Sequence, residues 1–236
     1  MTDPPPSALR LRVSEIFRSI QGEGPTAGLP ATFLRLAACN LRCHYCDTPY
    51  TWDFQRFDVA SEAHIEPVAA LVERLLAEGL DRVVVTGGEP LLQQANLAGL
   101  FERLPETVAI EIETNGTILP LPALLARVSQ WNVSPKLAFS GMPRDERIVM
   151  KVLQEFAACE RAWLKLVVAE PSDMDEGDEL ISASNWPHSR IVWMPEGTSA
   201  QRVTVRGRWV AEQALSRNQR FSTRLHVLLW GDKRGR

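Results

Sequence analysis

The alternation of apolar and polar residues along the chain predicts short strands separated by helices. Strands are expected at the β-rich runs, which are residues 11–17, 31–37, 82–86, 108–114, 131–134, 163–169, 190–194 and 224–229. The clearest helix begins near Pro67, a residue suited to a first turn, and ends at Gly79. One face of this helix is apolar, with Val68, Leu71, Val72, Leu75 and Leu76. A second helical pattern spaces Leu97, Leu100, Phe101 and Leu104 in the same way.

Strands that alternate with helices indicate an α/β fold with parallel strands joined by right-handed crossovers. Periodicity alone does not distinguish an open doubly wound sheet from a full or partial barrel. Several strands carry charges on one face while the other face stays apolar, at Arg35, Glu111, Glu113 and Lys165. A strand covered by helices on both faces should be almost wholly apolar, so these charges favour a barrel-like interior that holds a ligand. Edge strands with one solvated face are the alternative explanation.

Composition narrows the range of functions without adding a site. The 236 residues have 45% hydrophobic content and a formal net charge of -3, which suits one globular domain and disfavours direct nucleic-acid binding. Residues 1–10 are expected to form a disordered leader, because they are polar and proline-rich and do not resemble a secretion signal. No apolar run approaches the roughly 18 residues of a membrane span. We therefore expect a cytoplasmic protein that does not bind membranes.

Three of the four cysteines lie within eight residues, at Cys39, Cys43 and Cys46. They follow the expected strand 31–37 directly, and α/β folds build their sites at the carboxyl ends of strands. Three cysteines that hold a 4Fe-4S cluster leave one iron open to a ligand that is not protein. The alternative is a zinc site of the three cysteines and His44. That site is awkward, because His44 stands between two of its partner ligands and no second pair with zinc-finger spacing follows.

A second motif, Thr86-Gly87-Gly88-Glu89-Pro90, follows the strand 82–86. Its glycines allow the backbone to approach a ligand closely, and the Glu89 carboxylate could accept hydrogen bonds from an ammonium group. A simple turn between strand and helix would also explain this motif taken alone. In combination, the C-x3-C-x2-C loop, with Tyr45 before its last cysteine, and the later GGEP motif resemble the signature of the radical S-adenosylmethionine superfamily.

More of the chain resembles one family of that superfamily, the 7-carboxy-7-deazaguanine synthases of the pathways to 7-deazapurines such as queuosine. The resemblance runs from residue 14 to about residue 230. The matching segments are Glu15-Ile16-Phe17, Ser19-Ile20-Gln21-Gly22-Glu23-Gly24, Phe33-Leu34-Arg35-Leu36, Cys46-Asp47-Thr48, TGGEPLLQ, Glu113-Thr114-Asn115-Gly116 and Ser134-Pro135-Lys136. SIQGEG and CDT are the specific elements, whereas GGEP is common to the superfamily.

The resemblance implies a partial or modified (β/α) TIM-like barrel and a lyase reaction. The substrate would be 6-carboxy-5,6,7,8-tetrahydropterin, whose ring contracts by radical chemistry with loss of ammonia. A reduced cluster and S-adenosylmethionine would start the reaction, and the radical would be returned, so that S-adenosylmethionine acts as a cofactor. Mg²⁺, a homodimer and a flavodoxin- or ferredoxin-type electron donor are also implied. No catalytic side chain is expected beyond the cluster and the cofactor.

The family's roles transfer only to residues that match. Cys39, Cys43 and Cys46 would hold the cluster, and Thr48 would bind Mg²⁺ through its hydroxyl. The expected S-adenosylmethionine site comprises Tyr45, Cys46, Asp47, Gly87, Gly88, Glu89, Glu113, Ser134, Pro135 and Lys136. The expected pterin site comprises Ile20, Gln21, Gly22, Glu23, Arg35, Thr86 and His226.

Structural roles would also explain some of these residues. Arg35 could pair with Glu111 or Glu113, Thr48 could begin a turn before Pro49, and His226 could be a structural histidine of a strand. Cys159 is expected to be a small core residue. The chain departs from the family at Trp193-Met194-Pro195-Glu196-Gly197, where many members have Gln-Pro.

Two other functions compete with this interpretation. A glycyl-radical-enzyme activase would share the cysteine loop but would not explain SIQGEG, Arg35 or CDT. A non-catalytic zinc-binding scaffold would explain the cysteines alone.

Overall fold

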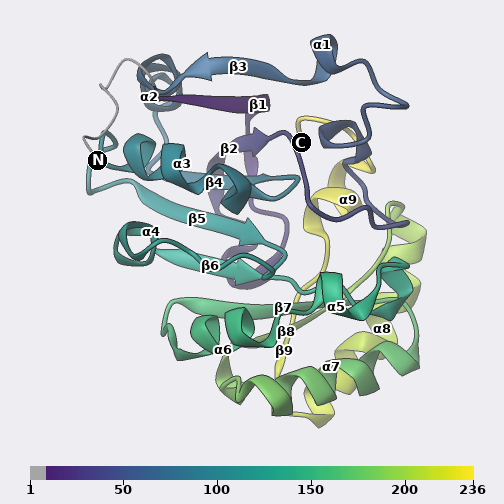
Figure 1. Ribbon diagram of the computed structural model, residues 1–236. Coiled ribbons are helices and arrows are strands. Elements are labelled where there is room, and N and C mark those ends of the chain that lie inside the picture. The colour runs from purple at the N-terminus through teal and green to yellow at the C-terminus, as the bar shows by residue number, and fades with distance from the viewer. Residues whose placement is uncertain (1–8) are drawn as a thin grey trace.

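The computed structural model describes residues 9–236, in which helices surround one nine-stranded sheet (Figure 1). The strands are β1 (Arg10–Ile20), β2 (Pro30–Leu36), β3 (His64–Pro67), β4 (Arg82–Gly87), β5 (Ala109–Thr114), β6 (Gln130–Val133), β7 (Ala162–Val168), β8 (Ile191–Pro195) and β9 (Arg220–Phe221). The helices are α1 (Val59–Glu62), α2 (Val68–Ala77), α3 (Gln94–Phe101), α4 (Pro122–Arg127), α5 (Arg144–Arg147), α6 (Met150–Ala158), α7 (Pro171–Ser184), α8 (Ala200–Ser216) and α9 (Leu225–Trp230).

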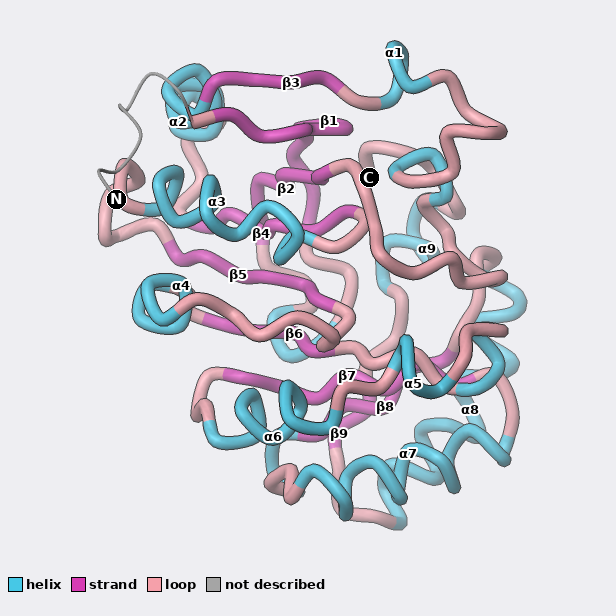
Figure 2. The backbone as a smooth tube through the Cα atoms, viewed as in Figure 1, coloured by secondary structure: helices cyan, strands magenta, loops and turns pink. Residues whose placement is uncertain are grey.

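The sheet is mostly parallel and does not close on itself. Its strand order is β3-β1-β2-β4-β5-β6-β7-β8-β9. Strand β1 pairs in antiparallel fashion with β2 and β3, and every neighbouring pair from β2 to β9 is parallel. The two edge strands, β3 and β9, do not pair with each other within residues 9–236. The fold is therefore a partial barrel, in which the edge strands β3 and β9 lie at the top and at the bottom of the view in Figure 2.

Alternation along the strands sorts the side chains between two faces of the sheet. On the outer face, Leu34, Val85, Ile112 and Leu164 belong to the main hydrophobic core together with side chains of helices such as α2, α3 and α6. On the inner face lie the charged residues that the pattern singled out, and three of them, Arg35, Glu113 and Lys165, line a cavity. The fourth, Glu111, is fully buried. The expectation of a polar barrel interior is thus confirmed.

Most predicted elements are present, and the errors concern short segments. Helix α2 follows Pro67 and ends just before Gly79, as expected. Strands β3 and β9 were missed, and residues 224–229 are not a strand, because Leu225–Trp230 forms α9. A short apolar run such as RLHVLL fits either type of element by periodicity. Of the expected leader, residues 1–8 lie outside the described residues, and Arg10 already begins β1. No helix within residues 9–236 is long and apolar enough to cross a membrane.

Candidate active site

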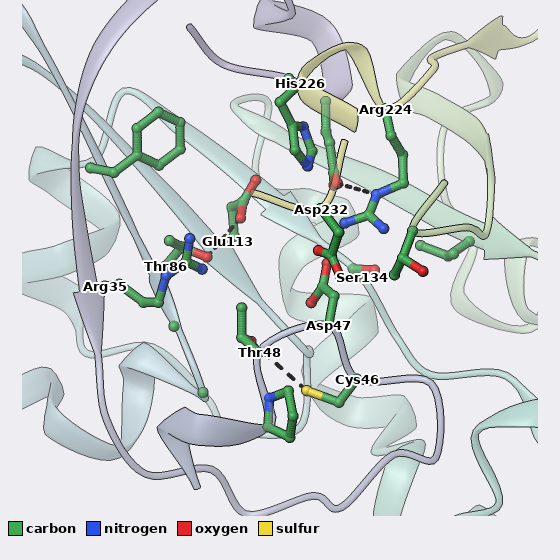
Figure 3. A pocket seen from close by; sticks show the side chains of 18 of the residues that line it. Arg35, Cys46, Asp47, Thr48, Thr86, Glu113, Ser134, Arg224, His226 and Asp232 are labelled. Carbon is green, nitrogen blue, oxygen red and sulfur yellow. Dashed lines mark hydrogen bonds and ion pairs between the residues drawn. The ribbon is translucent and has the colours of Figure 1, made fainter. Parts of the chain in front are cut away.

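A cavity of about 630 Å³ opens on the inner face, where the carboxyl ends of the parallel strands meet. Its wall includes segments that are far apart in the sequence: the loop after β1, the cysteine loop after β2, the ends of β4 and β5, the loop after β6, strand β7, the end of β8 with the loop after it, helix α9 and residues 231–236. Arg35, Thr86 and Glu113 are seen together in the close view, and Asp47 and Arg224 face them across the cavity (Figure 3). This volume lies within the range of about 300–1,000 Å³ that is typical of small-molecule sites.

The cysteine loop delivers three thiols to this cavity. Cys39, Cys43 and Cys46 all line it, and none of them forms a disulfide. Two N–H groups already point at the sulfur atoms: the Leu41 amide donates to Cys39 Sγ at 3.4 Å, and Trp52 Nε1 donates to Cys46 Sγ at 3.3 Å. Such donors are typical partners of sulfur ligands in iron–sulfur proteins. Cys159, by contrast, packs against the hydrophobic core, as expected for a small core residue.

Burial affects the chemistry of these thiols. It raises the pKa of Cys39 to about 12 and also raises the pKa of Cys43. The thiolate is the form that binds metal. Because burial disfavours the charged thiolate, a nearby positive charge is needed to stabilise it. Iron would supply that charge, and three thiolates on one cavity wall fit a cluster that keeps one iron free.

The zinc alternative does not fit the position of His44. Its ring packs against Gly141, where an added Cβ would lie 2.2 Å from His44 Cε1, and His44 does not line the cavity. Among residues 9–236, no three His, Cys, Asp or Glu side chains are arranged to hold a single metal ion. A cluster places each thiolate on a different iron, so it does not require the ligands to converge on one point.

The two glycines of the GGEP motif bring β4 against the cysteine loop. A Cβ on Gly87 would lie 2.1 Å from the Leu36 carbonyl oxygen, and one on Gly88 would lie 2.0 Å from the Ala38 carbonyl oxygen. Gly87 also has a φ of +131, in the region that favours glycine. Both positions therefore require glycine, and both line the cavity.

Glu89 lies behind the cavity wall, next to the two glycines. Its side chain is fully buried and accepts hydrogen bonds from Leu91 N at 3.0 Å, Thr114 Oγ1 at 2.8 Å and Asn115 N at 2.7 Å. It caps the turn Pro90–Gln93 and fixes the end of β5, and it does not line the cavity. The carboxylate therefore accepts its hydrogen bonds from the protein, and its expected contact with a ligand's ammonium group stays a prediction.

The other residues expected at S-adenosylmethionine mostly line the cavity. They are Tyr45, Cys46, Asp47, Gly87, Gly88, Glu113, Ser134 and Lys136, whereas Pro135 is absent from the wall. Tyr45 stacks on Phe139 with ring centroids 4.4 Å apart, which holds the ring beside the cysteine loop. The Asp47 side chain is 35% exposed, the largest exposure among these acidic groups, and is available to a ligand.

All seven residues expected at the pterin line the cavity: Ile20, Gln21, Gly22, Glu23, Arg35, Thr86 and His226. Hydrogen bonds connect two of them to the glutamates on the inner face of β5. Gln21 Nε2 donates to Glu111 Oε1 at 2.7 Å, and Thr86 Oγ1 donates to Glu113 Oε2 at 2.7 Å. A Cβ on Gly22 would lie 1.9 Å from His226 Nδ1, so glycine permits the close approach of α9. Burial lowers the pKa of His226, which favours the neutral imidazole.

Arg35 has an acidic partner other than those expected. Its Nε lies 2.7 Å from Glu15 Oε1, and Glu15 also accepts hydrogen bonds from Tyr50 and Arg234. The guanidinium carbon lies 5.3 Å from the centre of the Phe17 ring. Within residues 9–236, neither Nη atom of Arg35 has a hydrogen-bond partner, so the outer edge of the fork is available to a ligand.

Thr48 lines the cavity next to the cysteine loop. Its carbonyl oxygen accepts hydrogen bonds from Thr51 N and Thr51 Oγ1, so the backbone has the role expected of a turn residue. The hydroxyl takes no part in that turn and lies 3.8 Å from Cys46 Sγ (Figure 3). A hydroxyl on the cavity wall that keeps lone pairs beside this sulfur contact could serve as a single protein ligand for Mg²⁺, which usually keeps several other oxygen ligands.

Lys165 and Arg224 are charged wall residues that were not assigned a binding role from the sequence. Lys165 Nζ lies 2.5 Å from Glu23 Oε2 and 3.7 Å from Glu113 Oε1. Arg224 Nε lies 2.9 Å from Glu23 Oε1. Burial alone would raise the pKa of Glu23, but the charges of Lys165 and Arg224 hold it well below its usual value. The alternating strand pattern had pointed to Lys165, but no sequence signal linked Arg224 to a residue 201 positions away.

Comparisons with known proteins agree with this geometry. Residues 35–136 match the radical SAM superfamily. The 7-carboxy-7-deazaguanine synthase of Pyrobaculum aerophilum is 37% identical over 96% of this chain and 98% of its own length. That of Halobacterium salinarum is 36% identical over 94% of this chain and 91% of its own length. Among solved structures, QueE from Escherichia coli has a TM-score of 0.71 at 27% identity and covers 93% of this chain and 96% of its own. Streptococcus suis SuiB, at 15% identity and a TM-score of 0.53 over 80% of this chain and 46% of its own, shows only a similar fold.

Proposed function

Because the chain belongs to the 7-carboxy-7-deazaguanine synthase family and is a radical SAM enzyme, we propose that it converts 6-carboxy-5,6,7,8-tetrahydropterin to 7-carboxy-7-deazaguanine with loss of ammonia, as a lyase. One observation carries the proposal. Three free thiols, the Gly87-Gly88 turn and the Arg35 fork lie on the wall of the same cavity of about 630 Å³. A cluster with S-adenosylmethionine, when bound, supplies the means of abstracting hydrogen.

The chain's own residues would bind and orient the two ligands. On the cluster side, Cys39, Cys43 and Cys46 are the thiolate ligands, and Tyr45, Asp47, Glu113, Ser134 and Lys136 border the adjoining space. On the substrate side, the free Nη edge of Arg35 suits the carboxylate of the pterin, because a guanidinium fork can donate two parallel hydrogen bonds. Thr48 would contribute one oxygen to Mg²⁺.

Gln21 and Glu23 offer acceptors to the N–H groups of the pterin ring. Glu23 is held ionised between Lys165 and Arg224, and an ionised carboxylate has about four acceptor sites, so two remain for a ligand. An activase acts on a glycine residue of a partner protein. That substrate has no ring N–H donors and no carboxylate to match these groups. The polar wall therefore favours a small heterocyclic acid.

We also propose that the chain works as one domain, in the cytoplasm, as a homodimer, and with a flavodoxin- or ferredoxin-type donor, in queuosine-type 7-deazapurine biosynthesis. These proposals rest on the family. The three closely spaced free thiols support a reducing compartment.

The test is a reaction under anaerobic conditions. Reconstituted and chemically reduced protein is incubated with S-adenosylmethionine and the carboxypterin, and products are identified by mass. The proposal expects 7-carboxy-7-deazaguanine in the complete mixture only. Cleavage of S-adenosylmethionine without any deazaguanine would contradict the assigned substrate.

A further inference from the structure

Arg224 connects three segments of the cavity wall. It lies at the N-terminal end of α9 with 8% of its surface exposed. Its Nε donates to Glu23 Oε1 at 2.9 Å, and its Nη1 donates to the Gly197 carbonyl oxygen at 2.7 Å. Its Nη2 donates to Asp47 Oδ2, across the cavity from Arg35 (Figure 3). One guanidinium thus joins the loop after β1, the loop after β8 and the loop that carries the cysteines.

The two carboxylates that Arg224 contacts belong to different halves of the site. Glu23 lies among the residues assigned to the pterin, and Asp47 lies beside Cys46 among the residues assigned to S-adenosylmethionine. Both negative charges approach the same cation, so its removal would leave them facing one another. Glu23 would keep Lys165 as a partner, whereas Asp47 has no other ion pair within residues 9–236.

The geometry of the contacts also requires an arginine. Three different nitrogen atoms of one planar group reach three acceptors that point in different directions. A lysine ammonium has one nitrogen on a flexible chain and would reproduce only part of this arrangement.

We propose that Arg224 is a positioning residue that ties Glu23 to Asp47, so that the pterin and S-adenosylmethionine halves of the site are held in register by one side chain. The identity of the two ligands rests on the proposed function, but the three contacts do not. Loss of Arg224 should therefore loosen both halves together, whereas loss of Glu23 or Asp47 should affect mainly one.

The first measurement needs no ligand. Hydrogen–deuterium exchange is compared between the reconstituted wild type, Arg224→Gln, Arg224→Lys and the control Arg208→Gln, which changes an exposed arginine of α8. We expect faster exchange in residues 20–24, 43–48 and 196–199 of Arg224→Gln, an intermediate effect in Arg224→Lys and none in Arg208→Gln. Faster exchange confined to α9 would overturn the proposal. If Arg224→Gln does not fold, the same comparison is made with Arg224→Lys.

The second measurement separates the two halves by calorimetric titration of S-adenosylmethionine and of the carboxypterin into each protein. Arg224→Gln should weaken both ligands by tenfold or more with its iron content unchanged, while Glu23→Gln should weaken the pterin and Asp47→Asn should weaken S-adenosylmethionine. A folded Arg224→Gln protein that loses affinity for only one ligand, or for neither, would refute the proposal that Arg224 positions Glu23 and Asp47 together. If the wild type does not bind the carboxypterin, the proposed function is at fault, and the exchange data still decide the role of Arg224.

Discussion

Replacing Arg35 by alanine tests the assignment of the substrate carboxylate. The wild-type guanidinium uses its Nε for Glu15, and within residues 9–236 both Nη atoms of this cavity-lining residue have no hydrogen-bond partner. Removing a partly desolvated charge-assisted contact of this kind costs about 2–5 kcal/mol of binding, which is about 30-fold to several thousand-fold in affinity. We therefore expect Arg35→Ala to bind the carboxypterin more weakly than the wild type, by about 30-fold or more.

The cost to folding should be smaller than the cost to binding. The substitution removes one hydrogen bond to a charged group, worth about 1.5–3 kcal/mol of unfolding free energy. Glu15 keeps Tyr50 Oη at 3.0 Å and Arg234 Nε at 3.2 Å as partners, so its carboxylate is not left unpaired. A folded protein with a full cluster is therefore expected, against a typical stability of about 5–15 kcal/mol.

Three assays separate these effects. Iron content reports the cluster, slow cleavage of S-adenosylmethionine by the reduced protein reports the cofactor site, and deazaguanine formation against carboxypterin concentration reports the substrate. Arg35→Ala should keep its iron and its slow cleavage of S-adenosylmethionine but lose most of its deazaguanine formation. Arg35→Lys should recover only part of the deazaguanine formation, because an ammonium lacks the planar fork. Arg18→Ala, which removes an exposed arginine paired with Glu78, is the control. An unchanged affinity for the carboxypterin in Arg35→Ala would show that the carboxylate is bound elsewhere, and loss of iron would make Arg35 a structural partner of Glu15.

Three further predictions concern the cluster, the metal and a half-buried histidine. Alanine at Cys39, Cys43 or Cys46 should abolish both cluster assembly and activity, and Cys159→Ala should change little of either; iron per chain decides this, and a Cys159→Ala protein unable to hold four irons would overturn the ligand set. Mg²⁺ should raise turnover, and Thr48→Ala should weaken that response while Thr48→Ser keeps it. If product formation depends on Mg²⁺ concentration identically in the wild type and both variants, Thr48 is a turn residue and not a Mg²⁺ ligand. Burial lowers the pKa of His226 from 6.5, so protons bind the unfolded chain first and stability falls as the pH drops below 6.5. His226→Gln should lose less stability than the wild type between about pH 7.5 and about pH 5.5 in urea unfolding, and equal losses would contradict the lowered pKa of the half-buried imidazole.

The sequence predicted the parts of the site that are fixed by local motifs. Close thiols, a pair of glycines and a charge on an apolar strand each have a physical meaning that depends only on their near neighbours. The C-x3-C-x2-C loop, Gly87-Gly88 and Arg35 all lie on the wall of one cavity, and their binding roles stay predictions.

Other features depend on tertiary contacts that no local pattern contains. Spacing showed that Glu89 adjoins the glycines but not that its carboxylate turns toward Asn115. The run around His226 is short and apolar, and its helical form follows from contacts such as the hydrogen bond from Leu225 N to the Gly22 carbonyl oxygen. The acidic partners of Arg224, Glu23 and Asp47, lie 201 and 177 positions away from it in the chain, so only the folded structure brings them together.

The most direct test of the central claim is the number of deazaguanine molecules formed per S-adenosylmethionine consumed. Reduced, reconstituted protein is given the carboxypterin in large excess over a limiting supply of S-adenosylmethionine, and both 7-carboxy-7-deazaguanine and 5'-deoxyadenosine are quantified. A radical enzyme of this family that returns its radical should form deazaguanine well beyond the S-adenosylmethionine supplied. Consumption of S-adenosylmethionine with no deazaguanine formed would contradict the proposed reaction, and product limited to one per S-adenosylmethionine would contradict the role of S-adenosylmethionine as a regenerated cofactor.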